Sequence, residues 1–411
     1  MRTIAFARHP ELVVILAGVA AALHVGKLSP AIPVLREALG VSLVQAGFLL
    51  SLVQMAGMLL GLAVGLAADS IGLRRAMLCG LVVLSLAGGL GAMAQDPGSL
   101  LLLRAFEGCG FLLAVMPAPG LIRRLTPPAK MPSAMGLWGA YMPLGTATAL
   151  AVGPVLIGWA GWRVWWLVLA VLTLMMAVWV YLAVAADQQA RQTPSDGATT
   201  VRAAAAQPAL WLARMRRTLG ARGPWLVAVC FALYSGQWLA VIGFLPSMAG
   251  QAGAAGTGVA LLLALVALVN VAGNVASGRL LQRGVRASYL LFGGFCAMAL
   301  GAIVAFSAIG IDSLLLRYLG VLLFSMVGGV IPGTLFSLAV LLAPDEGSVS
   351  TTVGWMQQLS AVGQFCGPPV VAWVAARAGS WQWTWVVTGL CCLLGLLVAH
   401  RIGTEVARQH D

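Results

Sequence analysis

Long apolar stretches, separated by short polar or glycine-rich segments, fill nearly the whole chain. A helix needs about 20 apolar residues to cross a bilayer, and most of these stretches are at least that long. Backbone polar groups in hydrocarbon must be satisfied within their own segment, so helices are the expected element. The pattern predicts twelve transmembrane helices, at about residues 12–35, 43–68, 76–95, 98–121, 133–159, 163–187, 225–248, 257–281, 287–310, 313–342, 347–376 and 381–402.

The second half of the chain repeats features of the first half at an offset of 213 residues. Such a repeat in membrane segments is typical of transporters built from two parallel halves. We therefore expect an all-α membrane protein with two pseudo-symmetric six-helix halves. The matched pairs are Pro33 and Pro246, Arg104 and Arg317, Pro119 and Pro332, and Gly120 and Gly333.

A polar stretch near the middle of the chain interrupts the apolar pattern and carries six arginines. It divides the chain into an N-terminal half (1–187), a linker (188–223) and a C-terminal half (224–411). Within the linker, Trp and Leu alternate with Arg between Trp211 and Leu219. This part fits either a short amphipathic helix on anionic lipid headgroups or a plain solvated linker.

Composition supports a membrane protein, since 61% of the residues are hydrophobic and only 9% are charged. The mean hydropathy of +0.96 excludes a water-soluble core. If both termini are cytoplasmic, only Arg36, Arg163 and Arg377 of the basic residues lie outside. We therefore expect a multi-pass protein of the bacterial inner membrane with both termini in the cytoplasm. This placement accounts for the net charge of +12 without nucleic acid as a partner.

The sequence gives no sign of enzyme chemistry. Its seven cysteines lie in predicted spans without disulfide or metal-ligand spacing, and its four histidines are scattered. A phosphate-binding loop of the Gly-x-x-x-x-Gly-Lys-Ser/Thr type is also missing, which argues against ATP-driven transport by this chain alone. We expect a monomer without catalytic residues, metal or cofactor, with membrane lipid around it.

The loop between the second and third spans carries a motif, GLAADSIGLRR at 65–75. It resembles the signature loop of the major facilitator superfamily, whose fold has the two six-helix halves expected above. In that family the loop belongs to the gating contact between the halves. The corresponding loop of the second half has Gln282 where the acidic residue would sit, so we expect the ion pair of this gate in the first half. The resemblance assigns the gate to Gly65, Asp69, Gly72, Arg74 and Arg75.

Two further stretches, AVMP at 114–117 and MGLWGA at 135–140, resemble the cyanate permease and 2-nitroimidazole transporter group of that superfamily. Members of this group handle small polar or anionic solutes, so the resemblance favours import of a small solute. Gly153 and Pro154 partly match an element associated with antiporters. Export therefore stays open.

Ionisable residues within the spans are few, and such residues are costly in a membrane and mark pathways by default. The superfamily lines its central cavity with helices 1, 4, 7 and 10, so the resemblance places these residues at or near the cavity. Their charges leave a positive surplus. They are His24, Lys27, Arg104, Glu107 and Arg317.

Helix rise indicates that Lys27 and Arg104 lie at a similar depth, with Arg104 about 9 Å and Glu107 about 14 Å from the outer end of their helix. The two cations could bind one anion together, through an Arg fork and a Lys point charge. The substrate-binding residues we predict are Lys27, Arg104, Tyr141, Tyr234, Gln237, Trp238, Arg317 and Gln357.

The residues favour a secondary transporter that takes up a small organic anion together with protons. Glu107 would carry the coupling proton, with Arg104 and His24 beside it. Structural roles stay open for each: Lys27 could reach the headgroups, Arg104 could only neutralise Glu107, and His24 could only pack helices. An interfacial aromatic belt is the favoured explanation for Trp162, Trp165, Trp166, Trp381, Trp383 and Trp385. The alternative function is a drug or metabolite exporter that works as a proton antiporter.

Overall fold

The computed structural model describes residues 9–61, 72–127, 134, 137–187, 208–254, 256–308, 313–345 and 348–408. Within these ranges every regular element is a helix. Eleven described helical segments are long and apolar enough to cross a membrane. One of them, Tyr141–Ala183, turns sharply at Gly161, where φ is +84°. Counted on both sides of that turn, the segments give the twelve predicted crossings, which confirms the all-α membrane fold.

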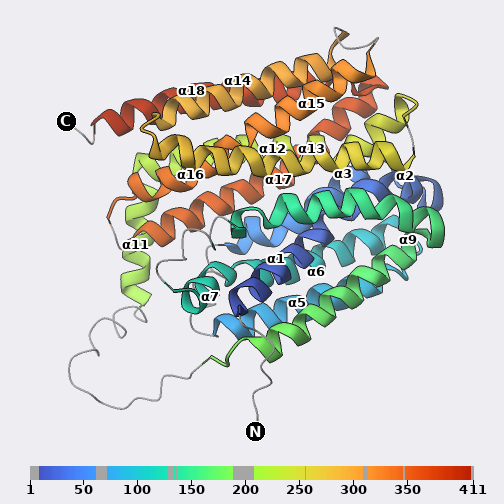
Figure 1. Cartoon of the computed structure of the whole chain (residues 1–411), viewed down its shortest axis with the longest axis horizontal. Helices are drawn as coiled ribbons and strands as arrows, with labels where there is room; N and C mark the ends of the chain where they lie inside the picture. Colours follow the sequence, from blue (N-terminus) through green and yellow to red (C-terminus); the bar gives the residue numbers. More distant parts are fainter. Residues whose placement is uncertain are drawn as a thin grey trace.

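The two halves of the chain lie against each other as two groups of helices (Figure 1). The first half contains α1 (Pro10–Gly26), α2 (Leu28–Leu39), α3 (Leu43–Ser51), η1 (Leu52–Gln54), α5 (Leu73–Gly91), α6 (Pro97–Val115), α7 (Ala118–Leu125) and α9 (Tyr141–Ala183). The second half contains α12 (Arg222–Gln251), α13 (Thr257–Gln282), α14 (Ala287–Phe306), α15 (Leu314–Gly328), α16 (Val330–Leu341), α17 (Val349–Ala378), η5 (Trp381–Trp383) and α18 (Thr384–Arg408).

Three of the predicted spans are interrupted four residues before a proline, and the prolines explain these breaks. A proline lacks the backbone N–H, and its ring clashes with the carbonyl group four residues earlier. The helices α1, α6 and α15 each end four residues before a proline, namely Pro30, Pro119 and Pro332. Since Pro119 and Pro332 are a matched pair of the repeat, both halves break their fourth helix at the corresponding point. The break near Pro30 has no counterpart in α12, which is continuous.

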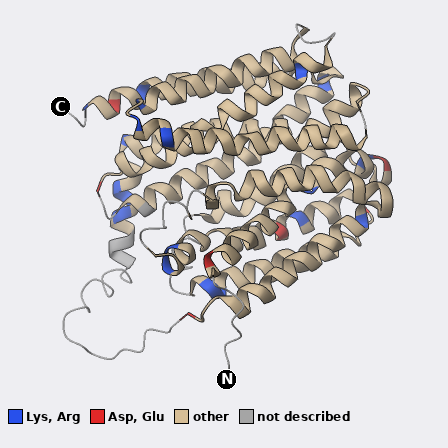
Figure 2. Cartoon of the chain, in the orientation of Figure 1, with Lys and Arg blue, Asp and Glu red and all other residues tan. Residues whose placement is uncertain are grey.

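The linker contains the helix α11 (Pro208–Gly220), so of the two alternatives for this part the structure has the helix. It lies across one end of the bundle (Figure 1), where Arg217 Nη1 is 3.2 Å from Asp345 Oδ2. The indole N–H of Trp225 donates to the carbonyl of Leu219 at 2.8 Å. We call this end the linker end and the opposite end, where α2 ends at Leu39, the distal end. Figure 2 shows that many of the basic residues gather at the linker end.

The predicted gating loop lies partly outside the described residues, which include Gly72, Arg74 and Arg75 but neither Gly65 nor Asp69. Gly72 has a φ of +101° directly before α5 begins. A carboxylate from the end of the sixth crossing caps this helix, because Asp187 accepts the backbone N–H groups of Arg75 at 3.0 Å and Arg74 at 3.3 Å. Sequence reasoning treated Asp187 only as the end of a span and missed this contact.

Replacing Asp187 by alanine should lower the free energy of unfolding by about 1 kcal/mol, the usual cost of a lost helix cap. Burial alone would raise the pKa of Asp187, but the N–H groups of Arg75 and Arg74 and the guanidinium of Arg124, 3.1 Å away, hold it below its ordinary value. The native state thus favours the ionised form, and its stabilisation is present at neutral pH and lost as pH falls below about 4. Thermal unfolding of both proteins against pH tests this, since their difference should shrink in acid. A difference that stayed constant would contradict the assignment.

The two halves meet along α3 and α17, along α9 and α13, and where α2 lies against α12. Near the distal end, Gly47 in α3 lies close against the backbone of α17. A Cβ atom added there would lie 2.8 Å from Cα of Pro369 and 3.0 Å from the carbonyl oxygen of Pro368. Further along the same seam, the Gln358 amide donates to the carbonyl of Met58 at 2.8 Å. The seam is therefore closed at the distal end in this structure.

Candidate functional site

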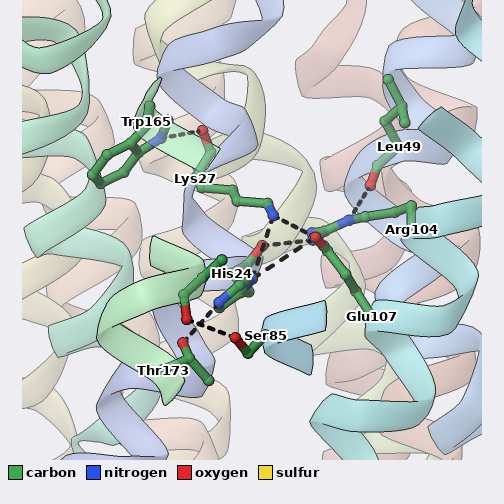
Figure 3. A network of polar contacts seen from close by, with 9 residues as sticks. His24, Lys27, Leu49, Ser85, Arg104, Glu107, Trp165 and Thr173 are labelled. Atoms are coloured by element: carbon green, nitrogen blue, oxygen red, sulfur yellow. Dashed lines mark hydrogen bonds and ion pairs between the residues drawn. The ribbon is translucent and has the colours of Figure 1, made fainter. Parts of the chain in front are cut away.

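Four ionisable side chains form a buried cluster in the first half (Figure 3). His24 and Lys27 are fully buried, and Glu107 and Arg104 are only 2% and 3% exposed. Lys27 Nζ donates to Glu107 Oε1, and Arg104 Nη1 donates to Glu107 Oε2 at 2.5 Å. Nδ1 of His24 lies 3.3 Å from Lys27 Nζ and 3.8 Å from Glu107 Oε1. The Glu107 carboxylate is thus the centre on which both cations converge.

Backbone carbonyls at and near the break between α1 and α2 accept hydrogen bonds from residues of this cluster and its surroundings. Lys27 is the residue between the two helices, and its carbonyl accepts the indole N–H of Trp165 at 3.2 Å. The carbonyl of His24 accepts Arg104 Nη1 at 2.6 Å, and Arg104 Nε donates to the carbonyl of Leu49 at 2.9 Å. Backbone carbonyls therefore fix the Arg104 guanidinium from two helices while its side chain pairs with Glu107.

The remaining contacts of the cluster come from α5 and α9. Thr173 Oγ1 lies 2.9 Å from His24 Nε2, and the Trp166 ring lies under Lys27, with its centroid 4.7 Å from Nζ. A Cβ atom on Gly88 would be 2.8 Å from the His24 ring and 3.3 Å from Glu107 Oε1, so only glycine leaves room for the cluster here. Among the described residues, these partners all belong to the first half, and the cluster lies within that half's own helices.

The cluster carries a surplus of positive charge. With His24 uncharged, Lys27 and Arg104 contribute two positive charges and Glu107 one negative charge. Arg104 Nη2 is buried and has no hydrogen-bond partner among the described residues. Buried charges that are not compensated are costly in a membrane protein and mark functional sites by default. The cluster is therefore poised to attract an anion.

Several of the open alternatives are now decided by contacts. Lys27 does not reach the headgroups, because it is fully buried. The interfacial explanation was wrong for Trp162, Trp165 and Trp166, which are at most 4% exposed and pack inside the first half. The turn at Gly161 sends the chain back into the bundle directly before them. Trp383 is 54% exposed, as a residue of an interfacial belt would be.

Arg317, the repeat partner of Arg104, occupies a different environment. It lies in the first turn of α15 and is half-buried, whereas Arg104 is enclosed. The position that corresponds to Glu107 in the repeat is Gly320. The second half therefore does not reproduce the charged cluster.

The predicted residues of the second half form neutral contacts. Asn270 donates to the hydroxyl of Tyr234 at 2.9 Å, and Trp238 donates to Ser325 Oγ at 3.2 Å. Gln237, the repeat partner of His24, accepts from the Cys392 thiol at 3.3 Å. These three residues of α12 are all buried.

The two other predicted residues lie elsewhere. Tyr141 stacks on Trp138 at a centroid distance of 4.3 Å, and Gln357 is half-buried on α17. The structure thus brings together four of the predicted site residues, His24, Lys27, Arg104 and Glu107, and adds Trp165, Trp166 and Thr173 to them. Threonine and tryptophan in a span carry no signal that would have distinguished these three from ordinary packing residues.

Replacing Trp165 by phenylalanine should cost about 1 kcal/mol of stability, because the buried hydrogen bond from its indole N–H to the carbonyl of Lys27 would be lost. The loss is measured as a shift in thermal unfolding of the purified protein. Trp159, which is 84% exposed, supplies the matched control, and its change to phenylalanine should have little effect. Equal shifts in both variants would show that the hydrogen bond to Lys27 contributes nothing.

Comparisons with known proteins agree with this architecture. The cyanate transport protein CynX of Escherichia coli (strain K12) is 26% identical over 409 residues, which cover 94% of this chain and 95% of CynX. The puromycin resistance protein pur8 of Streptomyces alboniger is 40% identical, but only over 101 residues. This match covers 24% of the chain and spans only 20% of pur8.

Among solved structures, a bacterial homologue of the human lysosomal transporter Spinster shares the fold. Its inward-facing unoccupied form matches with a TM-score of 0.71 at 14% identity and covers 98% of both chains. Its occupied form matches with a TM-score of 0.72 at 15% identity, over 97% of this chain and 96% of the other. The family profile of the Major Facilitator Superfamily matches residues 14–363. The chain therefore belongs to the major facilitator superfamily and is a membrane transporter.

Proposed function

We propose that this transporter moves a small organic anion by alternating access and couples its uptake to protons. One observation carries the proposal: the buried cluster of Lys27, Arg104 and Glu107 has one more positive than negative charge. This surplus would attract an anion, whereas a cationic substrate would be repelled. The similarity to a cyanate transport protein along nearly the whole chain supports a small anion as the substrate.

Lys27 and Arg104 bind the anion in this proposal, and Glu107 carries the proton with Arg104 and His24 beside it. The neutral residues Tyr141, Tyr234, Gln237, Trp238 and Gln357, together with Arg317, are proposed to contact the rest of the substrate as the halves move. Gly65, Asp69, Gly72, Arg74 and Arg75 would form the gate. We propose the bacterial inner membrane as the location, with the linker end in the cytoplasm and the protein as a monomer.

Thermal unfolding of the purified protein in detergent, with and without candidate solutes, tests the binding role. Cyanate, short monocarboxylates and dicarboxylates should raise the unfolding temperature of the wild type. The increase should disappear in Lys27→Met and in Arg104→Gln, and it should persist in Arg377→Gln, which removes an exposed guanidinium. Stabilisation by neutral or cationic compounds alone, unchanged in the Lys27 and Arg104 variants, would contradict the proposal.

Export is the second candidate, and the local similarity to a puromycin resistance protein favours it. An exporter should lower the sensitivity of expressing cells to toxic compounds. Its substrates would also have to avoid the buried surplus of positive charge. Growth assays with the wild type and Lys27→Met therefore discriminate between the two functions, because only anion uptake depends on Lys27.

A further inference from the structure

The carboxylate of Glu107 occupies the place on Lys27 and Arg104 that an incoming anion needs. We propose that the substrate anion binds by replacing this carboxylate, and that Glu107 takes up one proton for each monovalent anion. The inference rests on the proposed function and makes it specific. It defines Glu107 as an internal competitor of the substrate, and it fixes both the stoichiometry and the net charge of transport.

Competition follows from the contacts. One oxygen of Glu107 binds Lys27, and the other binds Arg104 Nη1 at 2.5 Å. Nε and Nη1 of Arg104 are further bound by the carbonyls of Leu49 and His24. Of the three guanidinium nitrogens of Arg104, only Nη2 has no hydrogen-bond partner among the described residues. A second carboxylate cannot reach both cations until Glu107 releases them.

The approach to Arg104 is narrow and apolar. A cleft beside Arg104 and Glu107 is lined by Leu28, Leu49, Gly91, Leu100, Leu103 and Trp166, and it is too narrow for a water molecule. Leu100 lies in the first turn of α6 and Gly91 ends α5, so the cleft points toward the distal end. The anion therefore enters only when these helices separate, and few non-hydrogen atoms fit beside the cations.

Charge counting links the proton to the anion. Without substrate, the cluster carries a charge of +1. A proton alone would raise this to +2 in a low-dielectric site. An anion alone would make the cluster neutral, but it would have to compete with the ionised Glu107 carboxylate for the same donors on Lys27 and Arg104. Both states are unfavourable, whereas a proton and a monovalent anion together restore +1. The two ligands therefore bind together.

No other charged group facing the cluster in the described residues changes this count. From α1 the only further titratable side chain is His24, which contacts Thr173 of α9. The residues of α5 and α9 around the cluster are Ser85, Gly88, Trp165 and Trp166, all uncharged. From α3 the contact is the backbone carbonyl of Leu49. The charge is thus the same with and without substrate, and a complete transport cycle moves no net charge.

Uptake into proteoliposomes that contain the full chain tests this inference, with labelled cyanate and acetate as probes. The membrane potential is set with potassium gradients and valinomycin, and the pH gradient is set independently. A lower pH outside the vesicles than inside should increase uptake several-fold. A membrane potential of either sign should leave the uptake rate unchanged. Uptake driven by the potential at equal pH would overturn the inference. Failure of both probes to bind or to be taken up would instead overturn the proposed function, and the inference with it.

The Glu107→Gln variant tests whether Glu107 competes with the substrate or only supports the fold. In Glu107→Gln the competing charge is absent, so anion affinity should rise at least tenfold and lose its dependence on pH. Uptake by this variant should become sensitive to the potential, because no proton accompanies the anion. Glu107→Asp keeps the charge and should keep the pH dependence. Unchanged affinity and pH dependence in Glu107→Gln would overturn the inference, and the potential test on the wild type decides it if this variant does not fold.

Discussion

Replacing Glu107 by glutamine should lower the free energy of unfolding by about 3–5 kcal/mol, the cost of leaving a buried charge without its partner. Lys27 and Arg104 are 0% and 3% exposed, so neither can turn to solvent when Glu107 loses its charge. Replacing Lys27 by methionine should cost far less. Arg104 and Glu107 would then form a neutral pair at 2.5 Å, and the stem of methionine fills a similar volume.

The asymmetry between these variants is the informative result, because it measures the surplus charge directly. Unfolding in mixed micelles gives the free energies for both single variants and for Lys27→Met combined with Glu107→Gln. The double variant leaves Arg104 as the only charge, so its stability should lie between those of the single variants. Glu405→Gln, which removes a half-buried carboxylate 3.7 Å from the exposed guanidinium of Arg408, should change stability by less than about 1 kcal/mol. Equal losses of unfolding free energy in Glu107→Gln and Lys27→Met would show that the cluster carries no surplus of positive charge.

The fold could be predicted because membrane-spanning segments are recognisable in a sequence by their length and apolar composition. Span positions agree with the structure to within a few residues at most ends, and the repeat correctly paired Pro119 with Pro332. The details of the helices depend on individual residues. Gly161, with a φ of +84°, makes the sharp turn between the fifth and sixth crossings, and Pro30 divides the first crossing at Lys27.

The candidate site was only partly predictable. A spacing of three residues on one helix was enough to pair Arg104 with Glu107. The direction in which the charged side chains of α1 and α6 point is set by helix packing, which the sequence does not show directly. Here a small residue permits the packing, since Gly88 lets α5 approach His24 and Glu107 closely. Lys27 therefore points among the helices of the first half, although its helix also belongs to the set that the superfamily uses for its central cavity.

The sequence does not reveal which uncharged residues contact the cluster. Trp165 and Trp166 follow a turn, where tryptophan usually marks a membrane interface. The structure uses the indole N–H of one and the ring face of the other to hold Lys27. Asp187 is comparable, because it lies at the end of a span and its capping role depends on Gly72 folding back toward it.

Replacing Gly47 by valine should open the distal seam between the halves. The contact there is with backbone, since a Cβ atom would lie 2.8 Å from Cα of Pro369 and 3.0 Å from its nitrogen. Neither proline can move aside without shifting α17. Overpacking of this kind costs about 1–3 kcal/mol, and every 1.4 kcal/mol is a tenfold change in an equilibrium constant. We expect the population to shift toward the state that is open at the distal end.

Hydrogen exchange measures this shift, because the distal ends of α2, α3 and α12 should exchange faster in Gly47→Val. Gly389→Val on α18 is the matched control, since a Cβ atom there meets nothing within 4 Å. The change penalises only the closed distal seam, so the rest of each half should keep its exchange rates. If transport proceeds by rocking of the halves, uptake should fall because the return to the closed distal state becomes slow. Unchanged exchange at the distal end would mean that the halves do not separate along α3 and α17.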